Sequence, residues 1–159
     1  METANGINAK GYLLGWTDAV VGMTTSDINA TPEDKWNESM GGCTRNCGEL
    51  CADAINLFDW TTAKMRGEEV TMADLNNGEA CSTKAGAAAR LGESAAAFKE
   101  ALAAASDDLL NTPVTAPFGM QMPLFMIATI AVSHVWYHDG QLNYVQCLLG
   151  DGEVHWNMG

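Results

Sequence analysis

The feature that most constrains this chain is a succession of four long stretches with helical signals, with no strand-like alternation between them. We expect helices over about residues 7–25, 44–66, 79–110 and 123–150. The segments that separate them are rich in Asn, Pro and Gly, which interrupt helices. Helices of this length bury their apolar faces against one another, so the sequence predicts an all-α fold, a four-helix bundle of the antiparallel type. A length of 159 residues suits a single domain over residues 1–159.

Each helix is predicted from its own pattern. The first carries side chains at spacings of three and four residues, namely Tyr12, Trp16, Ala19 and Met23. The second has an apolar stripe close to the helical period, made of Cys47, Leu50, Ala54, Leu57, Trp60 and Met65. The third is rich in Ala, the strongest helix former. Thr31 and Pro32 mark a short turn of helix before the second, with Thr31 as its N-cap. Three prolines in residues 111–123 predict a loop before the fourth.

The charge balance excludes several classes of partner. Eight basic and twenty acidic side chains give a net charge of −12, and such a surface repels nucleic acid and anionic membranes. The longest apolar run, residues 122–132, has eleven residues and is too short to span a bilayer. The N-terminus lacks the basic region and the apolar stretch of a secretory signal. Because the cysteines number five, an odd count, we expect reduced thiols in a cytoplasmic protein.

Two of the three histidines lie close together in a segment that is otherwise typical of a buried helix, HVWYHDGQLNYVQ. His134 and His138 are four residues apart, so both project from the same face of the helix, one turn apart. Two imidazoles in this arrangement can bind a single metal ion, each through one ring nitrogen. The alternative is a pair of structural or exposed histidines. A metal site needs a third ligand from elsewhere in the chain.

The same segment, extended to HVWYHDGQLNYVQCLLG, resembles the last helix of the DinB-like superfamily, also called the DinB/YfiT-like metalloenzymes. In that family a His-x3-His pair on the fourth helix is often followed by Gly-Gln, and a third histidine comes from the second helix. The segments TPEDKWNES and MGGCTRN before the second helix, and RG at its end, also fit the family. The resemblance covers essentially the whole chain. It implies a DinB/YfiT-like four-helix bundle that binds a divalent metal ion, usually zinc or nickel.

The chain departs from the family at the third ligand. Family members usually carry ELxxH on the second helix, whereas this chain reads GELCADAINLF, with Asp53 at the aligned position. Asp53 follows Leu50 by three residues and precedes Leu57 by four, which places it on the apolar stripe. A buried aspartate is costly unless it is paired or bound to a cation. The resemblance therefore implies a metal site of Asp53, His134 and His138, and the carboxylate would shift the preferred metal towards iron or manganese.

Two alternatives stay open for Asp53: it lies at a solvated edge of the stripe, or the site has lost its metal. Three further residues are possible members of the site. His155, beside Trp156 in the C-terminal tail, could be a fourth ligand or part of a lid, or it could be solvated. Glu49 precedes Asp53 by four residues, although its helical phase points slightly away. Gln141 follows the histidine pair in the Gly-Gln step of the motif.

The cysteines predict packing rather than a second metal site. Three of them repeat every four residues along the second helix: Cys43, Cys47 and Cys51. The outer two are about 12 Å apart at about 1.5 Å rise per residue, which is too far for one ion to bind all three. We therefore expect small apolar thiols on a packed face, with Cys81 and Cys147 also in the core. Tyr137 and Tyr144 could line the mouth of a pocket.

By the same resemblance, the leading functional hypothesis is a metal-dependent thiol S-transferase. Characterised relatives are metal-dependent transferases or isomerases that use low-molecular-weight thiols such as bacillithiol, mycothiol or glutathione. The partners would then be such a thiol and a small electrophile. Relatives are often dimers, so a homodimer is expected, and the Ala-rich third helix is compatible with one. Two alternatives stay open: a metal-dependent hydrolase, and a non-catalytic, stress-related bundle that acts through dimer or partner contacts and has neither a metal nor a convergent polar pocket.

Overall fold

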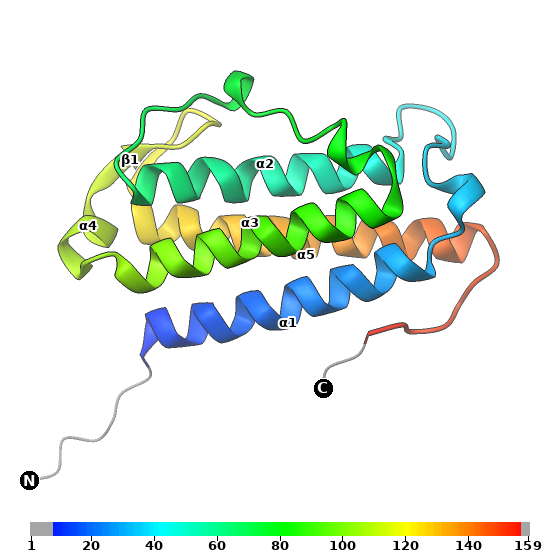
Figure 1. Ribbon diagram of the computed structural model, residues 1–159, viewed down its shortest axis with the longest axis horizontal. Helices are drawn as coiled ribbons and strands as arrows, with labels where there is room; N and C mark the ends of the chain where they lie inside the picture. Colours follow the sequence, from blue (N-terminus) through cyan, green and yellow to red (C-terminus); the bar gives the residue numbers. More distant parts are fainter. Residues whose placement is uncertain (1–7, 157–159) are drawn as a thin grey trace, which may run out of the picture.

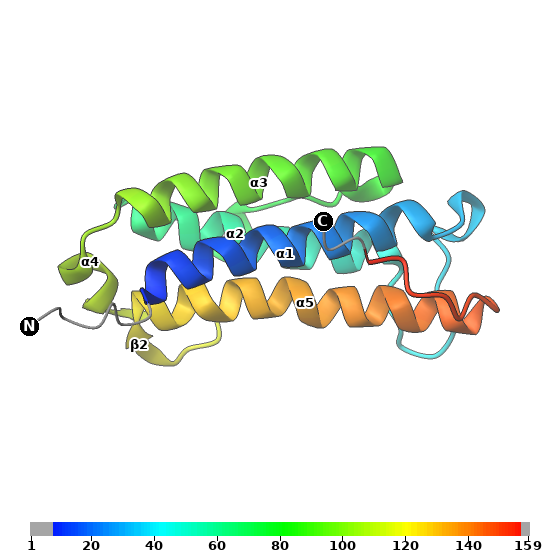
Figure 2. The ribbon, with the colours of Figure 1, turned by 90° about the horizontal axis from the view of Figure 1, so that it is seen from below.

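Four long helices form the body of the molecule in the computed structural model, which describes residues 8–156 (Figures 1 and 2). They are α1 (Ala9–Ala30), α2 (Cys47–Met65), α3 (Lys84–Ala104) and α5 (Leu124–Leu148). Each packs against two neighbours, because α1 and α2 both contact α3 and α5. The predicted all-α four-helix bundle is confirmed. No helix in the described part of the chain is both long and apolar enough to cross a membrane.

The directions of the helices differ from a simple antiparallel bundle. In Figure 1, α1 and α5 run one way, and α2 and α3 run the other way. The neighbours α2 and α3 are therefore parallel, and residues 66–83 carry the chain back along the bundle between them. Such a connection must cover the length of α2, about 28 Å at about 1.5 Å per residue. It contains two short turns of 3₁₀ helix, η2 (Met72–Asp74) and η3 (Ala80–Ser82).

Helix α1 is longer than predicted, and its buried face is shifted by one residue. The predicted end at Thr25 is wrong, because the helix continues to Ala30, where Thr31 donates its N–H and hydroxyl to the carbonyl of Asp27. Thr31 thus closes α1 instead of capping the following 3₁₀ turn, η1 (Glu33–Lys35). The buried positions are Leu13, Thr17, Val20, Met23, Thr24, Asp27 and Ile28. Polar residues on this inward face hide its periodicity.

Capping residues set the other helix boundaries. Asn46 caps α2 in a capping box with Glu49, so the helix begins three residues after the predicted start. Its predicted apolar stripe is buried throughout. The predicted third helix is divided into η3, α3 and α4 (Asp107–Asn111), because Thr83 and Ser106 each accept a backbone N–H and begin a new helix.

A small hairpin replaces part of the predicted loop before α5. Strands β1 (Pro113–Thr115) and β2 (Gln121–Pro123) pair antiparallel, with Val114 opposite Met122. The prediction of no strand was wrong here, because strands of three residues are too short to show alternation. Gly119 has a φ of +83° in the turn, a conformation that favours glycine.

The prediction that the cysteine thiols are packed in the core is confirmed only in part. Cys47, Cys51 and Cys81 are buried, whereas Cys43 and Cys147 are exposed, so the prediction was wrong for those two. Trp36 is fully buried and donates its Nε1–H to the carbonyl of Cys81 over 2.8 Å. This bond joins the segment before α2 to the segment before α3, and so fixes the end of the bundle from which α2 begins.

Candidate metal centre

The three predicted ligands come together between two neighbouring helices. Asp53 lies about two turns into α2, a position fixed by the Asn46 cap, and His134 and His138 project from α5. Their ligand atoms, one from each residue, all lie within 4.8 Å of one another. The Nε2 atom of His138 lies 3.1 Å from Asp53 Oδ2 and 3.1 Å from His134 Nε2. His134 Nε2 lies 3.7 Å from the same carboxylate oxygen. These three residues could hold one metal ion.

Gln141 fixes which nitrogen of His138 faces the cluster. The Nδ1 atom of His138 lies 2.6 Å from Gln141 Oε1. An amide oxygen only accepts hydrogen bonds, so Nδ1 carries the hydrogen and Nε2 presents a lone pair. The amide itself is oriented by its NH₂ group, which donates to the hydroxyl of Tyr137 over 3.4 Å. Gln141 therefore acts as the outer partner that metal-binding histidines usually have.

The convergence of acceptors indicates a place for a cation. The lone pair of His138 Nε2 faces a carboxylate oxygen of Asp53, which is also an acceptor. His134 can donate its one hydrogen to His138 Nε2 and Arg45 donates to Asp53 Oδ2, so the direct contact between His138 Nε2 and Asp53 Oδ2 stays a contact between two acceptors. The side chain of His138 is only 5% exposed, so water gives it little compensation. The donor set, two imidazoles and one carboxylate, is one that binds divalent transition metals.

The protonation states of the three side chains also favour the binding of a cation. Burial lowers the pKa of His134, and the neighbouring His138 lowers it further. Burial also lowers the pKa of His138, and this outweighs the opposite effects of Gln141 and Asp53. Burial acts to raise the pKa of Asp53, but Arg45 and the two imidazoles bring it below its ordinary value on balance. At neutral pH the histidines are therefore neutral and Asp53 is ionised, and these are the forms that bind metals.

Arg45 is a further member of the site that sequence reasoning missed. Its Nη1 atom lies 2.6 Å from Asp53 Oδ2, the same oxygen that faces the histidines. The loop before α2 carries it there: Gly41 and Gly42 have φ values of +104° and +61°, and Thr44 donates its hydroxyl to the carbonyl of Gly41 over 2.8 Å. Asp53 is 34% exposed, so it lies at the edge of the apolar stripe and is paired with a cation there.

A cavity of about 430 Å³ opens onto the cluster. Its polar lining includes Arg45, Gln141 and the exposed Tyr137 and Tyr144, a position that the sequence left open for the two tyrosines. The ring of Tyr137 lies edge-on to His138, with 5.1 Å between the ring centroids. A ligand of modest size can therefore reach the open side of the cluster.

A sequence model of the DinB superfamily matches residues 15–142, which is most of the chain. This chain belongs to the DinB superfamily. The matched region runs from α1 into α5 and includes Asp53, His134 and His138. No curated protein is similar enough in sequence to be matched. The membership agrees with the helical fold and with the two histidines on the last helix of this DinB-superfamily protein.

Two predicted site residues of the DinB-superfamily chain have other partners. The carboxylate of Glu49 accepts the backbone N–H of Asn46 over 2.9 Å and so belongs to the helix cap. The Nε2 atom of His155 lies 2.8 Å from Asp151 Oδ2 in the C-terminal tail. Trp156 donates its Nε1–H to Asp27 of α1 over 2.8 Å, which holds the tail against that helix. Neither Glu49 nor His155 joins the cluster of three.

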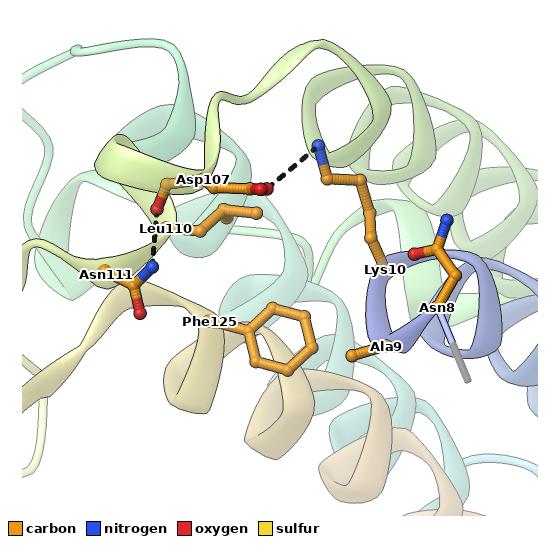
Figure 3. A pocket seen from close by; sticks show the side chains of 7 residues that line it. All are labelled: Asn8, Ala9, Lys10, Asp107, Leu110, Asn111 and Phe125. Atoms are coloured by element: carbon orange, nitrogen blue, oxygen red, sulfur yellow. Dashed lines mark hydrogen bonds and ion pairs between the residues drawn. The ribbon is translucent and has the colours of Figure 1, made fainter. Parts of the chain in front are cut away.

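A second cavity, of about 560 Å³, lies at the opposite end of this DinB-superfamily bundle and has no such cluster (Figure 3). It is bounded by the start of α1, by α4 and by Phe125 at the start of α5. Its charged groups are paired with each other or with backbone: Lys10 donates to the carbonyl of Ala105 over 2.6 Å and lies 3.9 Å from Asp107. Within residues 8–156, Asp53, His134 and His138 form the only group of three side chains placed to hold one metal ion.

Proposed function

We propose that this protein binds one divalent metal ion through Asp53, His134 and His138 and uses it to transfer a low-molecular-weight thiol to an electrophile. The observation that carries the proposal is the convergence of three possible ligand atoms, all within 4.8 Å of one another, beside a cavity that is open to solvent. A divalent ion bound there supplies a positive charge that lowers the pKa of an incoming thiol, so that a thiolate forms at neutral pH.

The donor set guides the choice of metal. Zinc and nickel are the metals implied by the resemblance to the family, whereas replacement of one imidazole by the Asp53 carboxylate favours the harder ions iron(II) and manganese(II). Three protein ligands leave positions open for a thiol. We therefore include all four metals in the test.

The side chains of the protein hold and orient the groups of the site. Gln141 holds the ring of His138, and Arg45 lies beside Asp53 at the mouth of the site. The cavity of about 430 Å³ has room for a small thiol. In the transfer, the sulfur forms a bond to an electrophilic carbon, and the electron pair of the bond to the leaving group departs with that group. The thiol proton goes to the solvent that the open cavity admits.

The site geometry favours this function over a non-catalytic bundle. A bundle acting only through partner contacts needs no convergent polar pocket, and this chain has one at Asp53, His134 and His138. A hydrolase would use the same residues with water in place of the thiol. The two activities differ in their products, so one experiment separates them.

The test uses protein reconstituted with zinc, nickel, iron(II) or manganese(II). Each form is incubated with glutathione, bacillithiol or mycothiol and with 1-chloro-2,4-dinitrobenzene, and the thioether in the small-molecule fraction is quantified by mass spectrometry. That fraction excludes modification of the exposed Cys43 and Cys147. We expect metal-dependent thioether formation that His138→Ala abolishes. Metal-loaded protein that forms no thioether above the uncatalysed rate, but hydrolyses a nitrophenyl ester, would instead assign a hydrolase.

A further inference from the structure

Asp53 and His134 together border two different cavities. The cavity of about 430 Å³ also contacts the loop before α2 and the C-terminal half of α5. The other, of about 300 Å³, lies beside the β1–β2 hairpin and η2. A metal ion held by the cluster would therefore be approachable from two sides. We propose that these two sides bind the two substrates of the reaction: an anionic thiol on the Arg45 side and an apolar electrophile on the hairpin side. This inference rests on the proposed function.

The Arg45 side has the chemistry to bind an anion. Among the described residues that line that cavity, Arg45 is the only Lys or Arg and Asp53 is the only carboxylate. The two are paired through Asp53 Oδ2 at 2.6 Å. A divalent ion on the same oxygen would compete for this charge and repel the guanidinium. Arg45, whose side chain is 53% exposed, would then be free to bind another carboxylate with two parallel hydrogen bonds.

The hairpin side has the chemistry to bind an apolar group. Apart from Asp53 and His134, the described residues that line it are all apolar: Leu57, Met72, Pro117, Phe118 and Ile130. Phe118 is 50% exposed and lies in the turn of the hairpin, so its ring lies where the cavity borders solvent. A small aromatic or aliphatic group loses water on entering such a space, whereas a charged thiol would lose its hydration without gaining a partner.

This division has a mechanistic consequence. The sulfur and the electrophilic carbon would reach the cluster from different sides, so the two substrates would bind together without displacing each other. The reaction would need no exchange of one substrate for the other within a shared cavity. The charge of the thiol, rather than its length, would decide its affinity.

The test measures binding rather than turnover. Protein loaded with Co²⁺ is titrated with 3-mercaptopropionate and with 3-mercapto-1-propanol, and the cobalt–thiolate charge-transfer absorption reports binding. Indole, an uncharged aromatic probe, is titrated by calorimetry. Arg45→Met and Phe118→Ser remove the two recognition features. Lys99→Met, which removes a cation paired with Asp18 on the α1–α3 face, and Met120→Ser, in the same hairpin turn, are the matched controls.

We expect wild-type protein to bind mercaptopropionate about tenfold more tightly than mercaptopropanol, as one charge-assisted bidentate contact predicts. Arg45→Met should remove this preference and leave the affinities for mercaptopropanol and indole unchanged. Phe118→Ser should weaken the binding of indole severalfold and leave the affinity for both thiols unchanged. Both controls should behave as wild type, and indole should bind equally well to the thiol complex.

The outcomes that would overturn the inference differ from the outcome that would overturn the proposed function. A preference for mercaptopropionate that persists in Arg45→Met, an unchanged affinity of Phe118→Ser for indole, or displacement of indole by thiol would overturn the two-sided site while the metal-dependent function stands. The visible absorption of bound cobalt is recorded for every variant. Its absence in wild-type protein would overturn the proposed function, and the inference with it.

Discussion

His138 donates its Nδ1–H to Gln141 Oε1 over 2.6 Å, three residues further along α5, and this bond turns Nε2 towards Asp53. The bond lies within one helix, so it forms as soon as α5 does and depends little on the rest of the fold. It also leaves the second nitrogen of a nearly buried ring with a lone pair that faces the carboxylate of Asp53, an arrangement that a metal ion bound between the two would stabilise.

The first prediction concerns this bond. Gln141→Leu should weaken metal binding about 10–100-fold, because the ring of His138 loses the acceptor that orients it. Gln141→Glu retains an acceptor at the same place and should keep most of the affinity. Competition with a chromogenic chelator measures the metal affinity of both variants. Equal affinity of Gln141→Leu and wild type would show that the bond does not support the site.

The second prediction concerns Arg45. Its guanidinium competes with a metal ion for Asp53 Oδ2, so Arg45→Met should tighten metal binding. Both side chains are partly exposed, and solvent screening limits the gain to severalfold. Arg66→Met is the matched control, since Arg66 pairs with Glu100 on the surface. Weaker metal binding by Arg45→Met would mean that Arg45 positions the carboxylate rather than competing for it.

The third prediction concerns a buried acid pair between α1 and α5. Asp27 and Asp139 are both fully buried, and burial together with the neighbouring Asp27 raises the pKa of Asp139 to about 7. An unfolded aspartate has a pKa of 3.8. Between these values only the folded chain holds the proton, so the free energy of unfolding falls as the pH rises from about 4 to about 7.

Asp139→Asn removes this dependence, because an amide does not ionise. Relative to wild type, the variant should therefore gain stability on going from pH 5 to pH 8.5, by on the order of 2 kcal/mol. Denaturant unfolding of both proteins at the two pH values measures the change. The same difference between variant and wild type at both pH values would show that Asp139 is ionised throughout.

The fourth prediction concerns the connection between α2 and α3. Asp59 accepts hydrogen bonds from Arg90, Asn77 and Ser94 at 2.6, 2.9 and 2.6 Å, which joins the connection to both helices. Asp59→Ala removes all three hydrogen bonds and leaves the Arg90 guanidinium without its close carboxylate partner, so it should cost about 2–4 kcal/mol of stability.

The matched control for Asp59 is Asp18→Ala, which breaks the surface pair with Lys99. It should cost less than about 1 kcal/mol, as exposed ion pairs do. Both values come from denaturant unfolding at neutral pH. Similar costs for the two variants would mean that the network around Asp59 contributes no more than a surface pair.

Helical periodicity made much of the site predictable. A spacing of four residues placed His134 and His138 on one face, and the stripe from Leu50 to Leu57 placed Asp53 towards α5. The structure brings the three together. Arg45 could not be predicted in this way, because it lies in a loop whose path depends on two glycines with positive φ. No period relates a loop residue to a helix that follows it.

Other features depended on tertiary context. The inward face of α1 carries Thr17, Thr24 and Asp27, so a search for apolar periodicity selected the neighbouring face with the exposed Tyr12. The parallel arrangement of α2 and α3 depends on the path of residues 66–83, which propensity does not encode. The expected homodimer and the cytoplasmic location stay predictions.

The most direct test of the account is the metal content of the purified protein, measured by plasma mass spectrometry for wild type, Asp53→Ala, His138→Ala and His155→Ala. We predict about one divalent ion per chain in wild type and in His155→Ala, since His155 pairs with Asp151 instead. Asp53→Ala and His138→Ala should lose the ion. Wild-type protein that holds no metal after reconstitution with zinc, nickel, iron(II) and manganese(II) would contradict the central claim.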